Sequence, residues 1–325
     1  MHLKLDTNET IIKFRMLALI HTKKDSIKTN KTFTMKTIIL FLLAVGIFTF
    51  SCTNNPGSKN TAENASKVFE LKEIWRTDTV LKTPESVLYD ETRDVLYVSN
   101  INSNPAEKDL NGFISLLSSD GEVTSPEWVT GLSAPKGMGV FSNLLYVADV
   151  TDLVIIDIDE AKIIQKIPVD SSVFLNDITV DASGKVYISD SRTGKIHIFE
   201  NGQVSEWISG LSNPNGLYAE ESRILLATSS FNSVDPTTGA VTMLADSIGH
   251  GDGIEFTGMA GYYMVSDWTG EVFLIYPDNS KTSVLQTRDQ KKNTADIGFI
   301  QETKVLLVPT FFGNQVVAYE LTEKD

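Results

Sequence analysis

The sequence predicts an all-β fold for residues 67–325, and two observations carry this prediction. From Val68 onward, short runs rich in Val, Ile, Leu and Tyr alternate with turns rich in Asp, Asn, Gly and Ser. No apolar spacing of helical period appears in this region. The only cysteine of the 325-residue chain, Cys52, lies upstream, so no internal disulfide can form and a large apolar core must hold the fold.

The apolar runs repeat. The most regular of them recur six times at intervals of about forty residues. They are DVLYVSN (94–100), NLLYVAD (143–149), KVYISD (185–190), RILLATSS (223–230), YYMVSD (262–267) and KVLLVPT (304–310). Each follows a shorter apolar strand and precedes a third one, such as GKIHIFE (194–200). Six such units predict a six-bladed β-propeller, with five or seven blades as the alternatives if the boundaries are misplaced.

The two ends of this region are expected to meet. The sixth unit closes with NQVVAYEL (314–321), and an unassigned strand, FELKEIWR (69–76), precedes the first unit. A propeller has to join its first and last blades, and an N-terminal strand added to the last blade removes exposed sheet edges. We therefore expect residues 69–76 to complete the last blade.

Residues 35–51 have the pattern of an export signal. Lys36 precedes fifteen uncharged residues (37–51), fewer than the roughly 20 that span a bilayer as a helix. Ser51 before Cys52 resembles a bacterial lipoprotein signal, although Thr49 replaces the usual aliphatic residue. That resemblance implies that Cys52 carries a lipid and anchors the protein to a bacterial membrane, on the periplasmic side or at the cell surface. An uncleaved membrane anchor is the alternative, and both imply export.

The segments beside this signal are not expected to belong to the fold. Signal sequences start near their positive end, so Met35 is the expected first residue, and residues 1–34 are a mis-assigned extension or a disordered leader. Residues 52–66 are polar, contain Pro, Gly, Ser and Asn, and are expected to form a flexible tether.

The charge of the chain restricts its partners. The net charge is −14, and without residues 1–51 it becomes −19, from 20 basic and 39 acidic residues. Such a surface repels nucleic acid and draws cations toward an acidic cleft. We expect a small-molecule substrate, no nucleic-acid partner, contact with a membrane only through the N-terminal lipid, and a monomer.

One position shared by the six units is polar in all of them. It lies just before the first strand of each unit, and its residues are Glu85, Lys136, Asn176, Asn215, Asp252 and Asp296. The first strand of a propeller blade is innermost, so these six residues, called the ring residues below, should surround one mouth of the central channel. Their type changes from unit to unit, which favours individual roles at a shared centre.

A second polar position repeats with little variation. The second strands of four units end in Asn100, Asp149, Asp190 and Asp267. An acid or amide that recurs at the end of a strand usually accepts hydrogen bonds from the backbone of a nearby turn. We therefore assign these four residues to structure.

The ring residues suggest a cation. Carboxylates held close together in a partly buried channel repel one another unless a cation or a proton lies between them. Oxygen donors without Cys or His favour calcium over zinc, and magnesium prefers stricter octahedra, although another divalent cation fits the same chemistry. The alternative is a water-filled polar channel.

Four ring residues carry a resemblance to a known family. Glu85 in TPESVLYDETRDVLYVS, Asn176 in LNDITVDASGKVYISD, Asn215 in NPNGL and Asp252 in GDGIEF resemble the calcium-ligand pattern of the six-bladed gluconolactonase/regucalcin-like (senescence marker protein) family. The pattern is also similar to that of diisopropyl fluorophosphatases and paraoxonases, and the resemblance covers residues 68–325. It implies that these four residues hold one Ca²⁺ and that the chemistry is hydrolysis of lactones, esters or phosphoesters.

Within that resemblance, Asp252 is the expected catalytic residue, as the base that takes a proton from water or as a direct nucleophile. His250 is its potential partner or a solvated loop histidine, and Trp268 lines the pocket mouth or packs between blades.

Two pocket positions depart from the family. Phe174 replaces an arginine that holds the substrate in the lactonases, and Lys136 stands where paraoxonase relatives carry a histidine. Lys136 is expected either to pair with Asp296 or Glu85 across the channel or to bind an anionic substrate. These departures predict a substrate other than gluconolactone. A propeller without catalysis, which binds a ligand or partner protein around a structural ion, is the alternative function.

Overall fold

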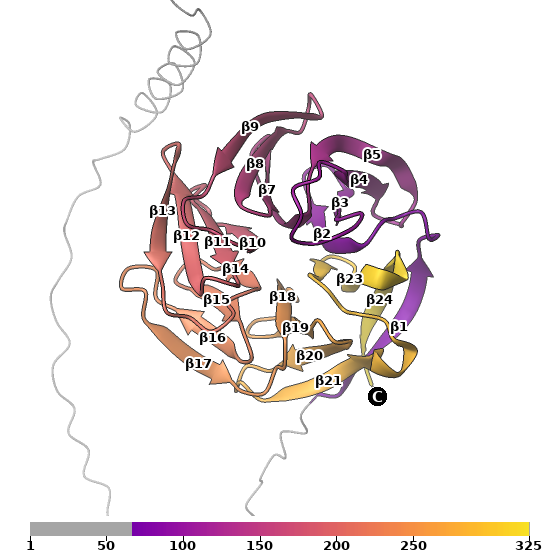
Figure 1. Ribbon diagram of the computed structural model, residues 1–325. Coiled ribbons are helices and arrows are strands. Elements are labelled where there is room, and N and C mark those ends of the chain that lie inside the picture. Colours follow the sequence, from indigo (N-terminus) through magenta and orange to yellow (C-terminus); the bar gives the residue numbers. More distant parts are fainter. Residues whose placement is uncertain (1–66, 325) are drawn as a thin grey trace, which may run out of the picture. The chain divides into compact units, whose positions relative to one another are not determined.

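The computed structural model describes residues 67–324, which form six antiparallel sheets of four strands each (Figure 1). This arrangement is a six-bladed β-propeller, and the predicted fold class and blade number are confirmed. The described residues also contain two short 3₁₀ helices, η1 (Arg288–Gln290) and η2 (Phe311–Gly313). No helix in residues 67–324 is long and apolar enough to cross a membrane.

In each blade the four strands succeed one another from the central channel outward. Blade 1 consists of β2 (Pro84–Asp90), β3 (Val95–Asn100), β4 (Gly112–Ser118) and β5 (Val123–Leu132). Blade 2 consists of β6 (Pro135–Phe141), β7 (Leu144–Asp149), β8 (Asp152–Asp157) and β9 (Lys162–Pro168). Blade 3 consists of β10 (Leu175–Val180), β11 (Val186–Asp190), β12 (Lys195–Glu200) and β13 (Gln203–Ile208). Blade 4 consists of β14 (Leu217–Ala219), β15 (Ile224–Ala227), β16 (Phe231–Val234) and β17 (Val241–Ala245). Blade 5 consists of β18 (Gly251–Phe256), β19 (Tyr263–Asp267), β20 (Glu271–Ile275) and β21 (Lys281–Gln286). Blade 6 consists of β22 (Gly298–Ile300), β23 (Val305–Pro309), β24 (Val316–Glu323) and β1 (Phe69–Arg76).

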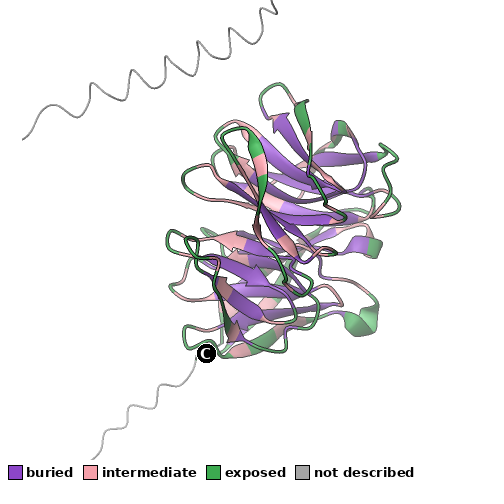
Figure 2. Ribbon diagram, turned by 60° about the vertical axis from the view of Figure 1, so that its left-hand side comes forward, coloured by how far each residue is buried: buried purple, intermediate pink, exposed green. Residues whose placement is uncertain are grey.

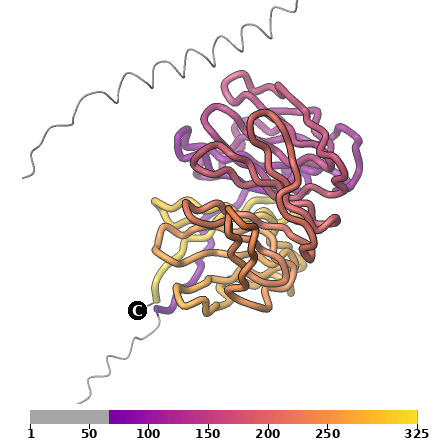
Figure 3. The backbone as a smooth tube through the Cα atoms, turned by 90° about the vertical axis from the view of Figure 1, so that its left-hand side faces the viewer, coloured from indigo at the N-terminus to yellow at the C-terminus, as the bar shows by residue number. Residues whose placement is uncertain are grey.

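The last blade is completed by the N-terminal strand, as predicted. β1 pairs with β24 from Phe69 opposite Glu323 to Arg76 opposite Val317, and the two strands lie side by side in Figure 3. The inner strands of blades 1 and 6 are joined as well. The Asp296 N–H donates to the Glu85 carbonyl at 2.9 Å. The ring of blades is therefore closed at both its outer and its inner circumference.

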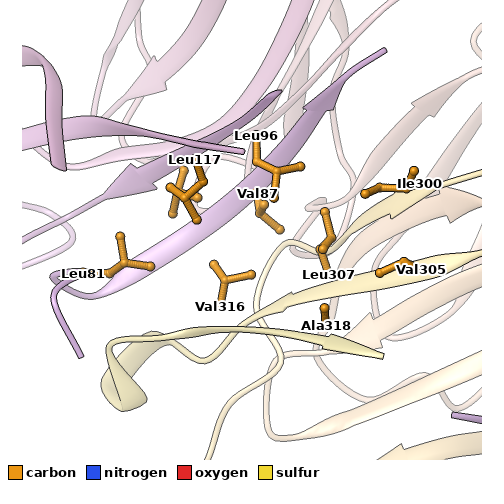
Figure 4. Close-up of a cluster of buried hydrophobic side chains, with 10 residues drawn as sticks. Leu81, Val87, Leu96, Leu117, Ile300, Val305, Leu307, Val316 and Ala318 are labelled. Carbon is orange, nitrogen blue, oxygen red and sulfur yellow. The ribbon is translucent and has the colours of Figure 1, made fainter. Parts of the chain in front are cut away.

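Six apolar clusters of the core lie between neighbouring blades, one at each interface. A smaller seventh cluster contains Ile101, Ala134, Val150, Ala295 and Phe311. At the interface of blades 1 and 6, Leu96 and Leu117 face Leu307 and Val316 (Figure 4). Buried residues dominate the inner strands, whereas outer strands such as β9 alternate partly buried and exposed residues (Figure 2). This pattern explains why the second strand of each unit gave the clearest apolar run in the sequence, since both of its faces are covered.

Glycines let the inner strands approach one another around the channel. A Cβ atom on Gly216 would lie 1.6 Å from the Asp252 carbonyl oxygen, and one on Gly253 would lie 2.4 Å from the Ile297 nitrogen. Both glycines directly follow a ring residue. The absence of a side chain at these positions is therefore what allows neighbouring ring residues to come close.

The expectations for the N-terminal segments lie outside the described residues. They concern the leader (1–34), the lipoprotein signal (35–51), the lipid on Cys52 and the tether (52–66). They stay predictions from the sequence.

A buried histidine on β12 makes the stability of the fold sensitive to acid. His197 is 2% exposed, and its Nε2 atom has no hydrogen-bond partner in the described structure. Burial lowers the pKa of His197 below its ordinary value, against the neighbouring carboxylates of Asp190 and Glu206 and together with Lys195. Below the ordinary pKa of about 6.5, the unfolded chain binds a proton that the folded chain excludes.

We therefore expect the free energy of unfolding to fall on acidification from pH 7 to pH 5 by up to about 1.4 kcal/mol per pH unit more than in a His197→Phe variant. Urea unfolding of both proteins at several pH values measures this difference, in which the contributions of all other titrating groups cancel. Parallel curves for the two proteins would contradict the expectation.

Candidate functional site

Five of the six ring residues line one cavity at a mouth of the channel. The cavity has a volume of about 220 Å³ and receives Glu85, Lys136, Asn176, Asn215 and Asp252 from blades 1 to 5. The other lining residues are Ile101, Pro105, Phe174, Asn213, His250, Gly251, Trp268 and Phe311. Convergent polar groups in a concave site of this kind are typical of ligand sites. We call this space the mouth cavity.

The sixth ring residue lies elsewhere than the sequence suggested. Asp296 lines a second cavity of about 250 Å³, together with Asp177 and Glu255, and is not among the residues of the mouth cavity. The reason is the backbone pairing, which sets Asp296 level with Ser86 instead of Glu85 and so one residue further along the channel. Burial raises the pKa of Asp296 to about 7.

The two asparagines of the mouth cavity are oriented through their amide nitrogens. Asn215 Nδ2 donates to Asp252 Oδ1 at 2.9 Å, and Asn176 Nδ2 donates to Ser191 Oγ at 3.0 Å. The Ser191 hydroxyl in turn donates to the Pro214 carbonyl at 2.8 Å. This bond orients the Ser191 oxygen that accepts from Asn176. Because both amide nitrogens already donate to acceptors in the protein, both amide oxygens are available to another partner.

Two oxygens of this set are buried and unpaired. Glu85 Oε2 and Asn215 Oδ1 have no hydrogen-bond partner among the described residues. Buried acceptors of this kind are costly unless something compensates them. Two carboxylates and two amide oxygens from four blades fit a hard divalent cation, which takes oxygen donors in flexible geometry. Residues 67–324 contain no group of three or more His, Cys, Asp or Glu side chains placed to hold a metal, so a cation here would depend on the two amides.

The carboxylates of the cavity are destabilised in their charged form. Burial, together with the neighbouring carboxylates of Asp252 and Asp296, raises the pKa of Glu85 well above its ordinary value. Burial and Asp296 raise the pKa of Asp252 in the same way. These groups therefore hold their protons more strongly than exposed carboxyls, unless a cation replaces the proton.

Lys136 brings a positive charge into the same cavity. The side chain is 1% exposed, and Nζ donates to the Ala134 carbonyl at 2.9 Å. Within residues 67–324 it forms no ion pair, so the expected bridge to Asp296 or Glu85 is not present. Burial lowers the pKa of Lys136 to about 8, while Glu85 and Asp149 act in the opposite direction.

Two cationic side chains contact the Phe174 ring. Lys136 Nζ is 4.4 Å and Arg192 Cζ is 4.5 Å from the ring centroid, within the range of cation–π interaction. Sequence reasoning missed Arg192, because an arginine in the turn SRTG has no feature that separates it from other surface cations. Only the fold places it over Phe174.

The polar residues that end the second strands serve the backbone, as predicted. Asp149 accepts hydrogen bonds from the Ser133 and Ala134 N–H groups, and Asp190 accepts them from Val173 and Phe174. Asn100 and Asp267 accept equivalent bonds from Lys82 and His250. In each blade the bond holds the loop that enters the innermost strand, so these residues position the ring residues without lining the cavity.

His250 and Trp268 both line the mouth cavity. The His250 side chain is 73% exposed, with Nδ1 4.0 Å from Asp267 Oδ1, which places it at the rim. Trp268 packs edge-on against Phe311, whose ring centroid is 5.5 Å away. Trp268 therefore does both things that the sequence left open, since it lines the cavity and packs against a neighbouring blade.

No protein-family model and no curated protein matches the chain by sequence. Solved structures match its fold. The chain is similar to a gluconolactonase from Xanthomonas campestris, at 15% identity over 74% of this chain and 87% of that one, with a TM-score of 0.58. It is similar to a streptogramin B lyase, at 11% identity over 79% and 98%, with a TM-score of 0.56. It is also similar to a chain of a nidogen/laminin complex, at 16% identity over 67% and 84%, with a TM-score of 0.57.

These similarities show the fold alone. They confirm that the chain has the propeller architecture found in gluconolactonase, which the ligand pattern had suggested. The lyase and the nidogen/laminin complex show that chains of this shape also serve other functions.

Proposed function

We propose that the protein is a calcium-dependent hydrolase that cleaves a lactone, ester or phosphoester bond in the mouth cavity. The observation that carries this proposal is the set of four oxygen-bearing side chains from four blades, two of whose oxygens are buried without a partner. The similarity of the fold to a gluconolactonase supports the reaction class.

Glu85, Asn176, Asn215 and Asp252 would hold the cation, with calcium the best match to their oxygen donors. When bound, a calcium ion supplies Lewis acidity that polarises a carbonyl or phosphoryl oxygen. Asn215 positions Asp252 through its hydrogen bond of 2.9 Å, and Ser191 positions Asn176. The cavity excludes bulk water from the 2%-exposed Asp252 carboxyl.

Asp252 is the candidate for proton transfer. Its carboxylate takes a proton from a water molecule while the water oxygen attacks the acyl carbon. The bond between that carbon and the leaving oxygen then breaks, and the proton passes to the leaving oxygen. Burial raises the pKa of Asp252, and a bound cation would oppose this shift and keep the carboxylate free of its own proton, ready to accept one from water.

Two other functions would be recognised by different experimental results. The streptogramin B lyase neighbour suggests, as one alternative, cleavage of a bond without water. The nidogen/laminin neighbour suggests, as the other, a binding role around a structural ion. Turnover in water labelled with oxygen-18 separates the first, because hydrolysis places one labelled oxygen in the product and elimination places none. Saturable metal binding without any turnover of lactones, aryl esters or phosphotriesters would favour the second.

We expect the metal-stripped protein to bind one Ca²⁺ per chain in calorimetric titration. Asn215→Ala should weaken binding by more than about tenfold, the low end of what even an outer-shell partner contributes to a metal site. A matched control is Asn213→Gly, which removes an amide from the same cavity and keeps the left-handed backbone at φ 48°. Absence of binding to the wild-type protein would mean that Lys136 takes the place of the ion, and the hydrolase proposal would fall.

A further inference from the structure

Two cations lie on one side of the mouth cavity, since Lys136 lines it and Arg192 packs on its lining residue Phe174. Lys136 and Arg192 both contact the Phe174 ring, from blades 2 and 3. Neither forms an ion pair with any residue in the described part of the chain, whereas Arg93, Arg223 and Arg288 each pair with a carboxylate. The three hydrogens of an ammonium and the five of a guanidinium leave most of their donors available here.

This side contrasts with the rest of a strongly acidic protein. Lys136 is almost completely buried, and its hydrogen bond in the described structure goes to a neutral carbonyl, Ala134 O. A buried cation without a contacting anion is unfavourable, and an anionic group of a ligand would relieve that cost. Arg192 is exposed, so it can reach a ligand without a rearrangement of the core.

The opposite side of the cavity is aromatic. Trp268 and Phe311, from blades 5 and 6, line the cavity and pack edge-on against each other. Phe312 continues this wall outward, with its ring centroid 4.7 Å from that of Phe311 and 68% of its surface exposed. Blades 2 and 3 are three positions from blades 5 and 6 in a ring of six, so the two cations and the two aromatic residues come from opposite blades. Ile101, Ala134 and Val150 belong to the same apolar cluster as Phe311 and Trp268.

From this arrangement we infer that the substrate is an anionic amphipathic ester or lactone, with its negative group bound at Lys136 and Arg192 and its apolar or aromatic part against Trp268 and Phe311. For the type of bond that is cleaved, the inference rests on the proposed function. For the charged and apolar groups of the substrate, it rests on the arrangement of the cations and aromatic rings. A neutral polyhydroxylated lactone matches neither side, since it offers no charge to the cations and little apolar surface to the aromatic wall.

A matched pair of ester probes tests the inference. Mono-para-nitrophenyl glutarate carries a carboxylate, and methyl para-nitrophenyl glutarate is its neutral counterpart with the same scissile bond. We expect the wild-type protein, with Ca²⁺ present, to prefer the anionic ester in kcat/KM by at least about tenfold, the low end for a hydrogen bond to a charged group. Arg192→Gln should remove most of this preference by lowering kcat/KM for the anionic ester more than for the neutral ester, and Arg192→Lys should restore part of it.

A control variant separates local contact from overall charge. Lys185→Gln removes the same charge from the same blade at the other end of β11, and it should keep the preference. A preference that survives Arg192→Gln, or one that Lys185→Gln reduces equally, overturns the inference.

A binding measurement tests the inference independently of the proposed hydrolysis. Phenylpropionate and its neutral amide are not cleaved, and their titration into the protein, followed by calorimetry, requires no catalysis. Tighter binding of the anion in wild type but not in Arg192→Gln supports the inference even if no ester is turned over, in which case only the proposed hydrolysis falls. Equal binding of the anion and the amide overturns the inference.

Discussion

Asp252→Asn is expected to reduce kcat/KM for the best ester or lactone substrate by about 10²- to 10⁴-fold, the usual contribution of a general acid or base. The amide keeps the shape of the side chain and an oxygen that can contact a cation, but it has no basic oxygen to accept a proton. The hydrogen bond from Asn215 can be kept, because the amide oxygen accepts it as the carboxylate oxygen does. Steady-state kinetics measures the loss, and calcium titration of the same variant separates proton transfer from metal binding.

Glu255→Gln is the matched control for this experiment. It neutralises a carboxyl of the same channel that lines the second cavity, whereas Asp296 is unsuitable because it raises the pKa of Asp252. We expect it to retain most of the activity. An Asp252→Asn variant with more than a tenth of wild-type kcat/KM, or equal losses in both variants, would assign Asp252 to structure or to metal binding only.

Gly216→Ala is expected to have the largest effect on stability among conservative changes at the channel. The added methyl group would lie 1.6 Å from the Asp252 carbonyl oxygen, a backbone atom that cannot move without shifting β18. Overpacking of a well-packed site typically costs 1–3 kcal/mol, occasionally more, and we expect a loss of at least about 2 kcal/mol here. Since the displaced residue is Asp252, calcium affinity should fall in the same variant.

Gly139→Ala offers a comparison in the same environment. Gly139 also lies on an innermost strand, but its added methyl would meet side-chain methyl groups of Val180 and Ile178 at 2.7 and 3.0 Å. Such groups can adjust by small rotations, so the loss should be smaller than for Gly216→Ala. Urea denaturation of the three proteins gives the order, and a Gly216→Ala variant as stable as wild type would show that the inner strands are free to separate.

Much of the fold could be predicted because a propeller repeats one local pattern. The second strand of each blade is covered on both faces, so its sequence is a nearly continuous apolar run bounded by turn residues. The closing strand 69–76 was recognisable because it was left over and the sheet edges of a propeller have to be paired. Neither conclusion needed knowledge of side-chain contacts.

The site was predicted less completely, and the reasons are geometric. Five ring residues share the mouth cavity because their positions in the repeat are equivalent. Asp296 departs from them, since the level of its strand is set by pairing with blade 1, which no repeat in the sequence encodes. Arg192 was missed for a related reason, because its contact with Phe174 depends on the direction of one turn.

The sequence by itself therefore determined the all-β class, the six repeats, the closure by the first strand and the identity of the polar residues around the channel. These features depend on periodicity and residue type, which are local properties of the chain. The tertiary structure alone decided which polar oxygens remain unpaired, which carboxyls share a cavity, and how Lys136 and Arg192 meet one aromatic ring. Those features depend on the relative height and rotation of neighbouring blades, which arise only when six sheets pack around a common axis.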